Sequence, residues 1–392
     1  MNELKIRASA GTTGNQEIGN FNSLQFLGTF NVLKAAGNEI AISQTSFGNS
    51  DLKWESTDQY DMGIEMSFFN SRLNIETDVY YKITNDLILN APLPWSTGFG
   101  SVSRNIGSVE NKGIEFTINS VNIEKGDFSW STDLNFASNR NEILKLGVNN
   151  ADIFPGPNFL GPTNILRVGQ QIGSIWGRVR LGTWGTDEAD EAARYGLKPG
   201  DVKWEDLNND GKIDGSDSKI IGRMYPKWTA NMTNTFIYKN FDLSFELRFV
   251  EGANVINATK HSVEDRQTLA NSYATVLDAW RPDNQNTMIA EVRAWGTPYL
   301  TNGDTHWMED GSFVRLQNLM LGYNLPSTLL DKWKLTKARV FFSGQNLFVL
   351  TDYSGYDPEV NTFEGSGQLP VGLDFFPFAR PRTFSAGLNL SF

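Results

Sequence analysis

Apolar and polar residues alternate one by one in many short segments of this chain, and this alternation restricts the possible fold more than any other feature. Between Met62 and Phe68 every second residue is apolar, and the alternation resumes between Leu73 and Tyr81. Successive side chains of a β-strand point to opposite faces, so each segment predicts a strand with one apolar and one polar face. The pattern recurs in GIEFTIN (113–119), FSWSTDLNF (128–136), FDLSFELRF (241–249) and TFSAGLNLSF (383–392). We count roughly ten to twelve such segments, which predicts an all-β chain.

The connections between these segments are of two kinds. Three hairpins have short turns, at residues 70–72, 124–126 and 239–240. Other connections are long, at residues 145–165, 185–225 and 252–310. Short turns at one end and long loops at the other are typical of outer-membrane barrels, and acidic residues on the polar face suit a watery lumen. We therefore predict an antiparallel transmembrane β-barrel with long extracellular loops, while a soluble sandwich or barrel that packs its apolar face inward remains the alternative.

Aromatic residues stand near several predicted strand ends. They suit the interfacial girdles of a membrane barrel, although each one alone is equally compatible with ordinary packing. These residues are Trp54, Tyr80, Tyr81, Trp228, Tyr238 and Trp333.

The composition excludes several classes of function. The 392 residues include no cysteine and only two histidines, His261 and His306, which rules out disulfides, thiolate chemistry and a three-histidine zinc site. The net charge of −11 disfavours a nucleic-acid partner, which needs a basic patch. No run reaches the ~18 consecutive apolar residues of a membrane-spanning helix. Nothing selects a nucleophile or a catalytic carboxylate pair, so we predict that the protein is not an enzyme.

Five longer segments resemble, in the same order along the chain, one known family of barrels. They are residues 49–89, IGSVENKGIEFTIN (106–119), EDGSFVRLQNLMLGYNLP (309–326), VFFSGQNLFVLTDYSGYDPEV (340–360) and RPRTFSAGLNLSF (380–392). Together they resemble the SusC/RagA-type TonB-dependent transporters of the bacterial outer membrane. The resemblance implies a barrel of about twenty-two strands around a plug, energised by the TonB complex and closed by a SusD-type surface lipoprotein. It also implies glycan or peptide substrates and a location in outer-membrane lipid.

The number of predicted strands departs from that family pattern. Ten to twelve strands form about half of such a barrel and leave two unpaired edges, which lipid does not tolerate. We therefore expect residues 1–392 to be the C-terminal portion of a transporter, with the plug, the segment that contacts TonB and the earlier strands lying before Met1. A smaller barrel that closes by itself is the other possibility.

The segment 201–222 contains the sequence DLNNDGKIDGSD, whose oxygen-bearing residues have the spacing of a calcium-binding loop. Gly211 stands where the chain must turn, and Asp217 replaces the usual glutamate at loop position 12. The candidate ligands for Ca²⁺ are Asp206, Asn208, Asp210, Lys212 through its carbonyl, Asp214 through water, and Asp217. A metal-free turn is the alternative. If the β-region were a soluble scaffold, the chain would be a secreted, calcium-stabilised binding module, which is our alternative function.

Two further segments predict a local feature, one a helix and the other an assembly signal. Between Ser262 and Pro282, the apolar residues Leu269, Tyr273, Val276, Leu277 and Trp280 have the spacing of one helix face, which predicts a helix inside a long loop. The last residue, Phe392, ends an alternating strand. In outer-membrane barrels a terminal aromatic residue resembles the signal that the assembly machinery reads, and we expect this role for Phe392.

Overall fold

The computed structural model describes residues 1–15, 23–34, 37–147, 149–155, 161–264, 271–293, 303–362 and 372–392. Its main element is one antiparallel sheet of ten strands, which confirms the all-β prediction. In spatial order the strands are β1 (Glu3–Asn15), β4 (Glu55–Phe68), β5 (Leu73–Pro92), β6 (Ser101–Lys125), β7 (Phe128–Leu146), β13 (Trp228–Tyr238), β14 (Phe241–Glu251), β17 (Phe313–Asn324), β18 (Lys337–Thr351) and β20 (Thr383–Ser391).

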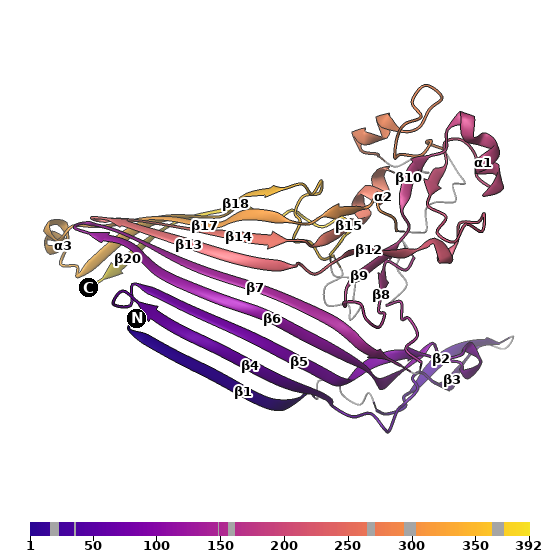
Figure 1. Ribbon diagram of the computed structural model, residues 1–392, viewed down its shortest axis with the longest axis horizontal. Coiled ribbons are helices and arrows are strands. Elements are labelled where there is room, and N and C mark those ends of the chain that lie inside the picture. The colour runs from indigo at the N-terminus through magenta and orange to yellow at the C-terminus, as the bar shows by residue number, and fades with distance from the viewer. Residues whose placement is uncertain are drawn as a thin grey trace.

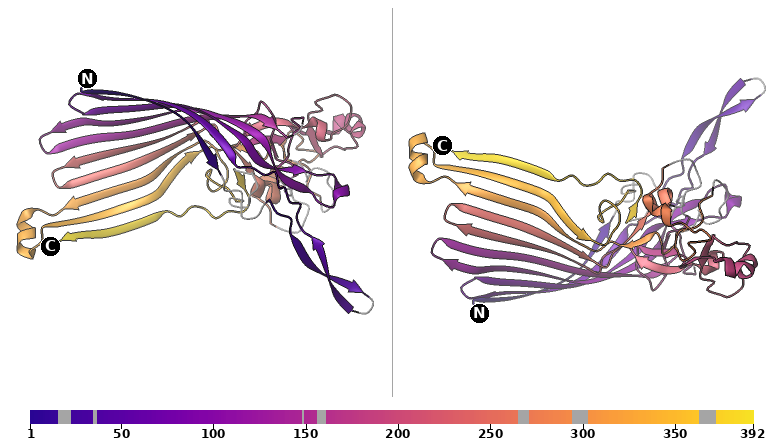
Figure 2. Two further views of the ribbon diagram at one scale, coloured as in Figure 1. Left: turned by 90° about the horizontal axis from the view of Figure 1, so that it is seen from below. Right: turned by 90° about the horizontal axis from the view of Figure 1, so that it is seen from above.

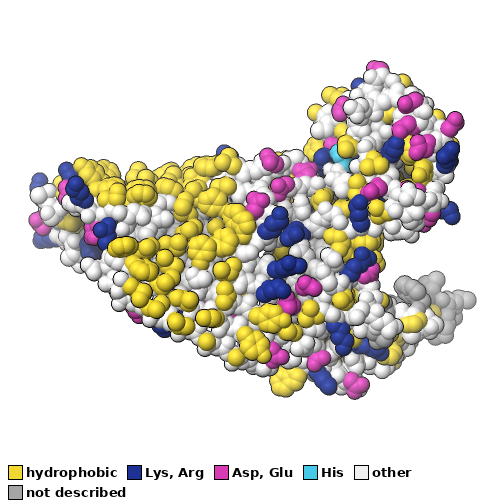
Figure 3. Space-filling model, viewed as in Figure 1, with side chains coloured by type: hydrophobic (Ala, Val, Ile, Leu, Met, Phe, Trp, Pro, Cys, Tyr) yellow, Lys and Arg dark blue, Asp and Glu magenta, His cyan; other side chains and the backbone are white. Residues whose placement is uncertain are grey.

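The alternation in the sequence becomes a difference between the two faces of this sheet. Cross-strand partners share a face, and they match apolar with apolar residues, as in the row Leu134, Met232 and Leu247. Large apolar side chains on this face are open to the surroundings, with Met62 49% and Leu388 58% exposed. Figure 3 shows the face as a broad apolar area over the strands. A soluble sandwich would bury such a surface, whereas a transmembrane sheet presents it to lipid.

The sheet is curved and open, and its two ends differ (Figures 1 and 2). Both chain termini and the short turns lie at one end, and the long connections lie at the other. Within the described residues, β1 pairs only with β4 and β20 pairs only with β18, so each is an edge. A curved antiparallel sheet with two edge strands is the geometry expected of part of a barrel.

The predicted short turns are confirmed by backbone conformation. Strand β4 ends at Phe68 and β5 begins at Leu73, and Asn70 and Ser71 between them have positive φ angles. Gly126, with φ 59°, joins β6 to β7. One connection at this end was not predicted, since the short helix α3 (Ser327–Trp333) joins β17 to β18.

The long connections fold into small sheets at the opposite end, which we call the loop cap. The cap strands are β8 (Asn164–Ile165), β9 (Ser174–Gly177), β10 (Arg180–Thr183), β11 (Val202–Trp204), β12 (Lys219–Arg223), β15 (Asn254–Asn257), β16 (Met308–Asp310) and β19 (Leu373–Asp374). Its helices are α1 (Ala189–Arg194) and α2 (Ala258–Glu264). A separate hairpin of β2 (Leu27–Lys34) and β3 (Gly37–Gln44) projects from the same end (Figure 1).

The helix predicted between Ser262 and Pro282 is wrong as a single element. Helix α2 ends at Glu264, and the next described element is the 3-10 turn at Ala274–Asp278. Leu269 lies outside the described residues. Leu277 is 77% exposed while Trp280 is 5% exposed, so the apolar residues do not form one packed face. Among the described helices, none has the length and apolar character to cross a membrane.

We expect Met232→Arg to destabilise the folded protein by about 2–4 kcal/mol, because Met232 lies on the apolar face in the middle of β13. The matched control is the neighbouring substitution Thr233→Arg. Thr233 lies on the polar face beside Asp133 and Glu246, so the new arginine gains acidic neighbours. The measurement is the denaturant midpoint of the full-length protein in detergent. Equal midpoints for the two variants would contradict the assignment of the apolar face to lipid.

Candidate functional site

The polar face of the sheet carries a cluster of charges near its N-terminal edge. Arg7 on β1 reaches Glu65 on β4 at 2.8 Å, and Glu76 and Asp78 on β5 at 2.5 and 3.0 Å. Gly63 leaves room for this arginine, since a Cβ atom there would lie 2.3 Å from a carboxylate oxygen of Asp78. The pairs are partly exposed, so each contributes little to the stability of the fold. Their main effect is a polar, hydrogen-bonding wall.

A second cluster connects the polar face to the segment after β18. Arg248 on β14 and Arg315 on β17 are cross-strand partners. Asp357 contacts Arg315 at 2.6 Å, and Glu359 contacts Arg248 at 3.0 Å and Arg315 at 3.2 Å. Arg380 reaches Glu359 at 3.2 Å. The side chains of Arg315 and Asp357 are only 4% and 9% exposed, so loss of either would leave a buried charge without its partner. This cluster therefore fixes the loop segment onto the polar face.

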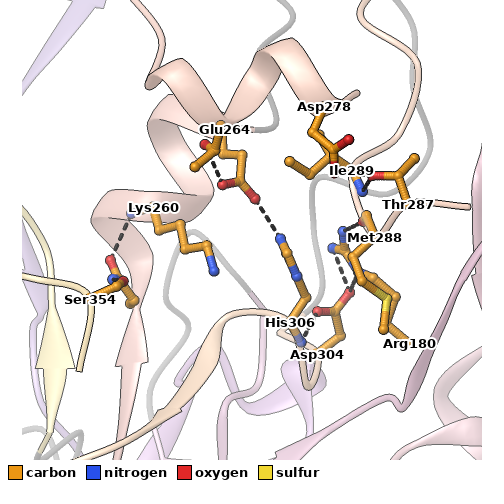
Figure 4. Close-up of polar contacts among 12 residues, drawn as sticks. Arg180, Lys260, Glu264, Asp278, Thr287, Met288, Ile289, Asp304, His306 and Ser354 are labelled. Carbon is orange, nitrogen blue, oxygen red and sulfur yellow. Dashed lines mark hydrogen bonds and ion pairs between the residues drawn. The ribbon is translucent and has the colours of Figure 1, made fainter. Parts of the chain in front are cut away.

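The loop cap is held together by a buried ion pair (Figure 4). Arg180 donates from Nε to Asp304 at 2.8 Å, and the two side chains are 1% and 0% exposed. Asp304 also accepts from the indole of Trp204 at 3.0 Å. Arg180 donates to the carbonyl of Met288 and lies 4.7 Å from the ring of Trp307. The Arg180–Asp304 pair thus joins four segments that are far apart in the sequence, around residues 180, 204, 288 and 304–307.

A second buried pair lies beside the first. His306 Nε2 is 2.5 Å from Glu264 Oε1, and Thr275 also donates to Glu264. Burial lowers the pKa of His306 below its ordinary value, although the Glu264 carboxylate opposes this shift. Burial raises the pKa of Glu264, but the bonds from His306 and Thr275 outweigh it and hold the pKa below its ordinary value. A neutral His306 that donates to ionised Glu264 satisfies both directions.

The Asp-rich loop is ordered by its own side chains. Asp206 accepts from the backbone N–H of Gly211 at 3.0 Å, and its other oxygen is buried and accepts no hydrogen bond from a described residue. Asp217 is 1% exposed and accepts from the N–H groups of Leu207 and Asp214, at 3.0 and 2.8 Å. The first and last predicted ligands therefore both help to close the loop.

The middle of this loop consists of local turns. The N–H of Asp210 donates to Asn208, and the N–H of Lys212 donates to Asp210. Arg178 lies nearby, and burial lowers its pKa while the charges of Asp217 and Asp214 oppose that shift. Within the residues that the structure describes, no group of three or more His, Cys, Asp or Glu side chains is arranged to hold a metal ion. The calcium site stays a prediction that rests on loop spacing and on the free oxygen of Asp206.

The structure also places the terminal Phe392 and the aromatic residues that the sequence assigned to the interfacial girdle. Phe392 follows the last residue of β20 and is 89% exposed. Tyr81 lies on the apolar face, while Tyr80 turns to the polar face, where its hydroxyl donates to Asn139. Tyr80 is therefore not a girdle residue. The buried pairs of the loop cap were missed, because their partners are too far apart in the sequence to show a spacing signal.

Comparison with known proteins confirms the resemblance seen in the sequence. The family model described as TonB dependent receptor-like, beta-barrel, matches residues 1–347. TonB-dependent receptor P3 of Formosa agariphila is 38% identical over 398 residues, which cover 99% of this chain and 39% of that receptor. TonB-dependent receptor SusC of Bacteroides thetaiotaomicron is 29% identical over 410 residues, which cover 100% of this chain and 38% of SusC. The solved structure of the RagAB peptide transporter contains a similar chain, with 27% identity and a TM-score of 0.83.

The similarity covers nearly all of this chain but only part of each relative. The alignment with the RagAB structure covers 99% of this chain and 41% of that chain, so the present chain spans about two fifths of the relatives it matches. The ten-stranded sheet, its two unlike faces and its long loops at one end all agree with this similarity. The chain belongs to the family of TonB-dependent receptor-like β-barrels and is most similar in type to SusC and RagA receptors.

Proposed function

We propose that this chain forms the C-terminal strands of an outer-membrane transporter that imports oligosaccharides or peptides. In this proposal the protein works with a SusD-type surface lipoprotein and is energised by the TonB complex through a preceding segment. Transport needs no chemical reaction from the chain, so the function is not enzymatic.

The observation that carries the proposal is the sheet with one apolar, exposed face and one charged face. In a closed barrel the apolar face contacts lipid and the charged face lines an aqueous lumen. Hydrogen-bonding groups such as those around Arg7 and Arg315 suit polar, oligomeric solutes. The unpaired edges of β1 and β20 support closure by further strands, because unpaired backbone groups are costly in lipid.

One similar protein supports the peptide class of substrate. The RagAB structure is described as a peptide transporter, and SusC is named a TonB-dependent receptor. These words concern those proteins, and the oligosaccharide class and the SusD-type partner rest on the family resemblance of the sequence.

The proposed function is tested by deletion of the full-length gene. We expect cells without it to lose growth on one oligosaccharide or peptide source while growth on the corresponding monomers is unchanged. Tagged full-length protein, purified in mild detergent, should copurify with a SusD-type lipoprotein. Unchanged growth on every oligomeric source, together with the absence of a lipoprotein partner, would overturn the proposal.

We also propose that the loop at 206–217 binds Ca²⁺ and that the ion braces the loop cap. The support is the set of oxygen donors at calcium-loop spacing and the free buried oxygen of Asp206. We expect calorimetric titration of the full-length protein to show a divalent-cation site that is lost in Asp206→Ala with Asp210→Ala. Equal calcium affinity in the wild type and the double variant would contradict this role.

Phe392 is included in the proposal as the outer-membrane assembly signal. Its exposed position after the edge strand β20 is compatible with recognition by another protein. Deletion of Phe392 from the full-length protein should lower the amount inserted in the outer membrane, measured by surface labelling. The matched control is Phe392→Tyr, which retains a terminal aromatic ring. Equal labelling of all three proteins would count against a signal role.

A further inference from the structure

A cleft with basic walls lies where the barrel wall meets the loop cap. It has a volume of about 600 Å³ and lies between the end of β7 and the strands β9 and β12. Three of its lining residues, Arg140, Arg223 and Lys227, are cations, and Glu142 is the acid among the lining residues. A local excess of positive charge is notable because the chain as a whole has a net charge of −11.

These cations are poorly neutralised. Arg140 is 74% exposed at its side chain, and its guanidinium is 3.9 Å from Glu142, at the outer limit of an ion pair. In the part of the chain that the structure describes, the guanidinium of Arg223 and the ammonium of Lys227 have no acidic partner. The amide side chains of Gln170 and Gln171 add hydrogen-bond donors to the wall. The cleft therefore favours an anion with several acceptor oxygens.

The position of Arg140 relates the cleft to the membrane boundary. Arg140 is the cross-strand partner of Lys112, which in turn is opposite Tyr81 and then Tyr60. These four side chains form one row on the apolar face, with Tyr81 37% and Tyr60 56% exposed. Aromatic rings in such a row are typical of the interfacial girdle of a membrane barrel. In Figure 3 basic side chains gather beyond the apolar area, over the loop-facing ends of β6, β7 and β13.

An aromatic surface lies directly on the membrane side of this row. Phe136 precedes Arg140 by four residues on β7, roughly 13 Å along the strand. Its ring stacks with Phe116 at 5.0 Å and with Trp228 at 5.8 Å, and all three belong to the apolar face. A soluble anion gains nothing from this surface, whereas the acyl chains of a lipid would cover it.

From this arrangement we propose that the cleft and the aromatic surface bind a phosphorylated glycolipid of the outer leaflet. The phosphate contacts Arg140, Arg223 and Lys227, and the acyl chains lie along Phe116, Phe136 and Trp228. The inference rests on the proposed outer-membrane function, because the long loops then place the cleft at the outer leaflet. It assigns the site to a lipid headgroup and not to free phosphate.

The test uses full-length protein purified in detergent and native mass spectrometry with bisphosphorylated lipid A as the probe. We expect the wild type to bind this lipid at least about tenfold more tightly than the dephosphorylated lipid with the same acyl chains. The variant Arg140→Gln/Arg223→Gln/Lys227→Gln should lose that preference. The matched control, Lys239→Gln/Lys332→Gln/Lys337→Gln, removes the same charge from exposed residues at the opposite end of the sheet and should retain it.

Three results would overturn the inference. The first is equal binding of the two lipids by the wild type, and the second is an undiminished preference in the cleft variant. The third is full competition by inorganic phosphate, which would show a site for soluble anions. Folding of each variant is checked by the temperature at which the barrel unfolds in denaturing gels. Uptake by the wild type is measured as well, so the absence of a lipid preference in the wild type together with intact uptake rejects this inference alone and leaves the proposed function standing.

Discussion

The pairing of backbone groups across neighbouring strands is the interaction on which the rest of this structure depends. A strand in lipid has no water to satisfy its N–H and C=O groups, so each strand must be bonded on both sides. Nine consecutive antiparallel pairings from β1 to β20 meet this requirement for the eight inner strands of the described sheet. Once pairing fixes the register, alternation alone decides which side chains meet lipid and which meet the lumen. The separation of the two environments is thus a consequence of hydrogen bonding combined with residue order.

The long loops lie outside the large sheet, so other contacts must stabilise their conformation. Their strands are short, and buried polar contacts join them, namely the ion pair of Arg180 with Asp304 and the hydrogen bond between His306 and Glu264. A buried ion pair costs desolvation energy, and removal of one partner costs about 3–5 kcal/mol because the other charge stays behind. Such pairs are sensitive to geometry, so they favour one arrangement of the loop cap over others. The acids at Asp357 and Glu359 extend the same principle to the polar face of the sheet.

A feature of this structure could be predicted from the sequence only where neighbouring residues carry its pattern. Alternation acts over a few residues, and it correctly located strands such as β4, β5 and β14 and the turn between β4 and β5. The strands of the loop cap have two to five residues, too few for alternation to show them. The apolar spacing between Ser262 and Pro282 suggested one helix, but Trp280 is buried while Leu277 is exposed. The partners Arg180 and Asp304 are 124 residues apart, a separation at which a single sequence holds no spacing information.

Strands β7 and β13 separate before β7 ends, and this separation determines which sequence changes the loop between them tolerates. Strand β7 continues to Leu146 in register with β6, while its pairing with β13 stops at Ala137 opposite Thr229. The loop between β7 and β13 therefore begins and ends where these two strands are no longer paired with each other. Insertions or deletions there need not shift any pair in the ten-stranded ladder. A change of length in this segment therefore leaves the pairing of the sheet intact, whereas a change that removes Arg180 leaves the buried Asp304 of another loop without its partner.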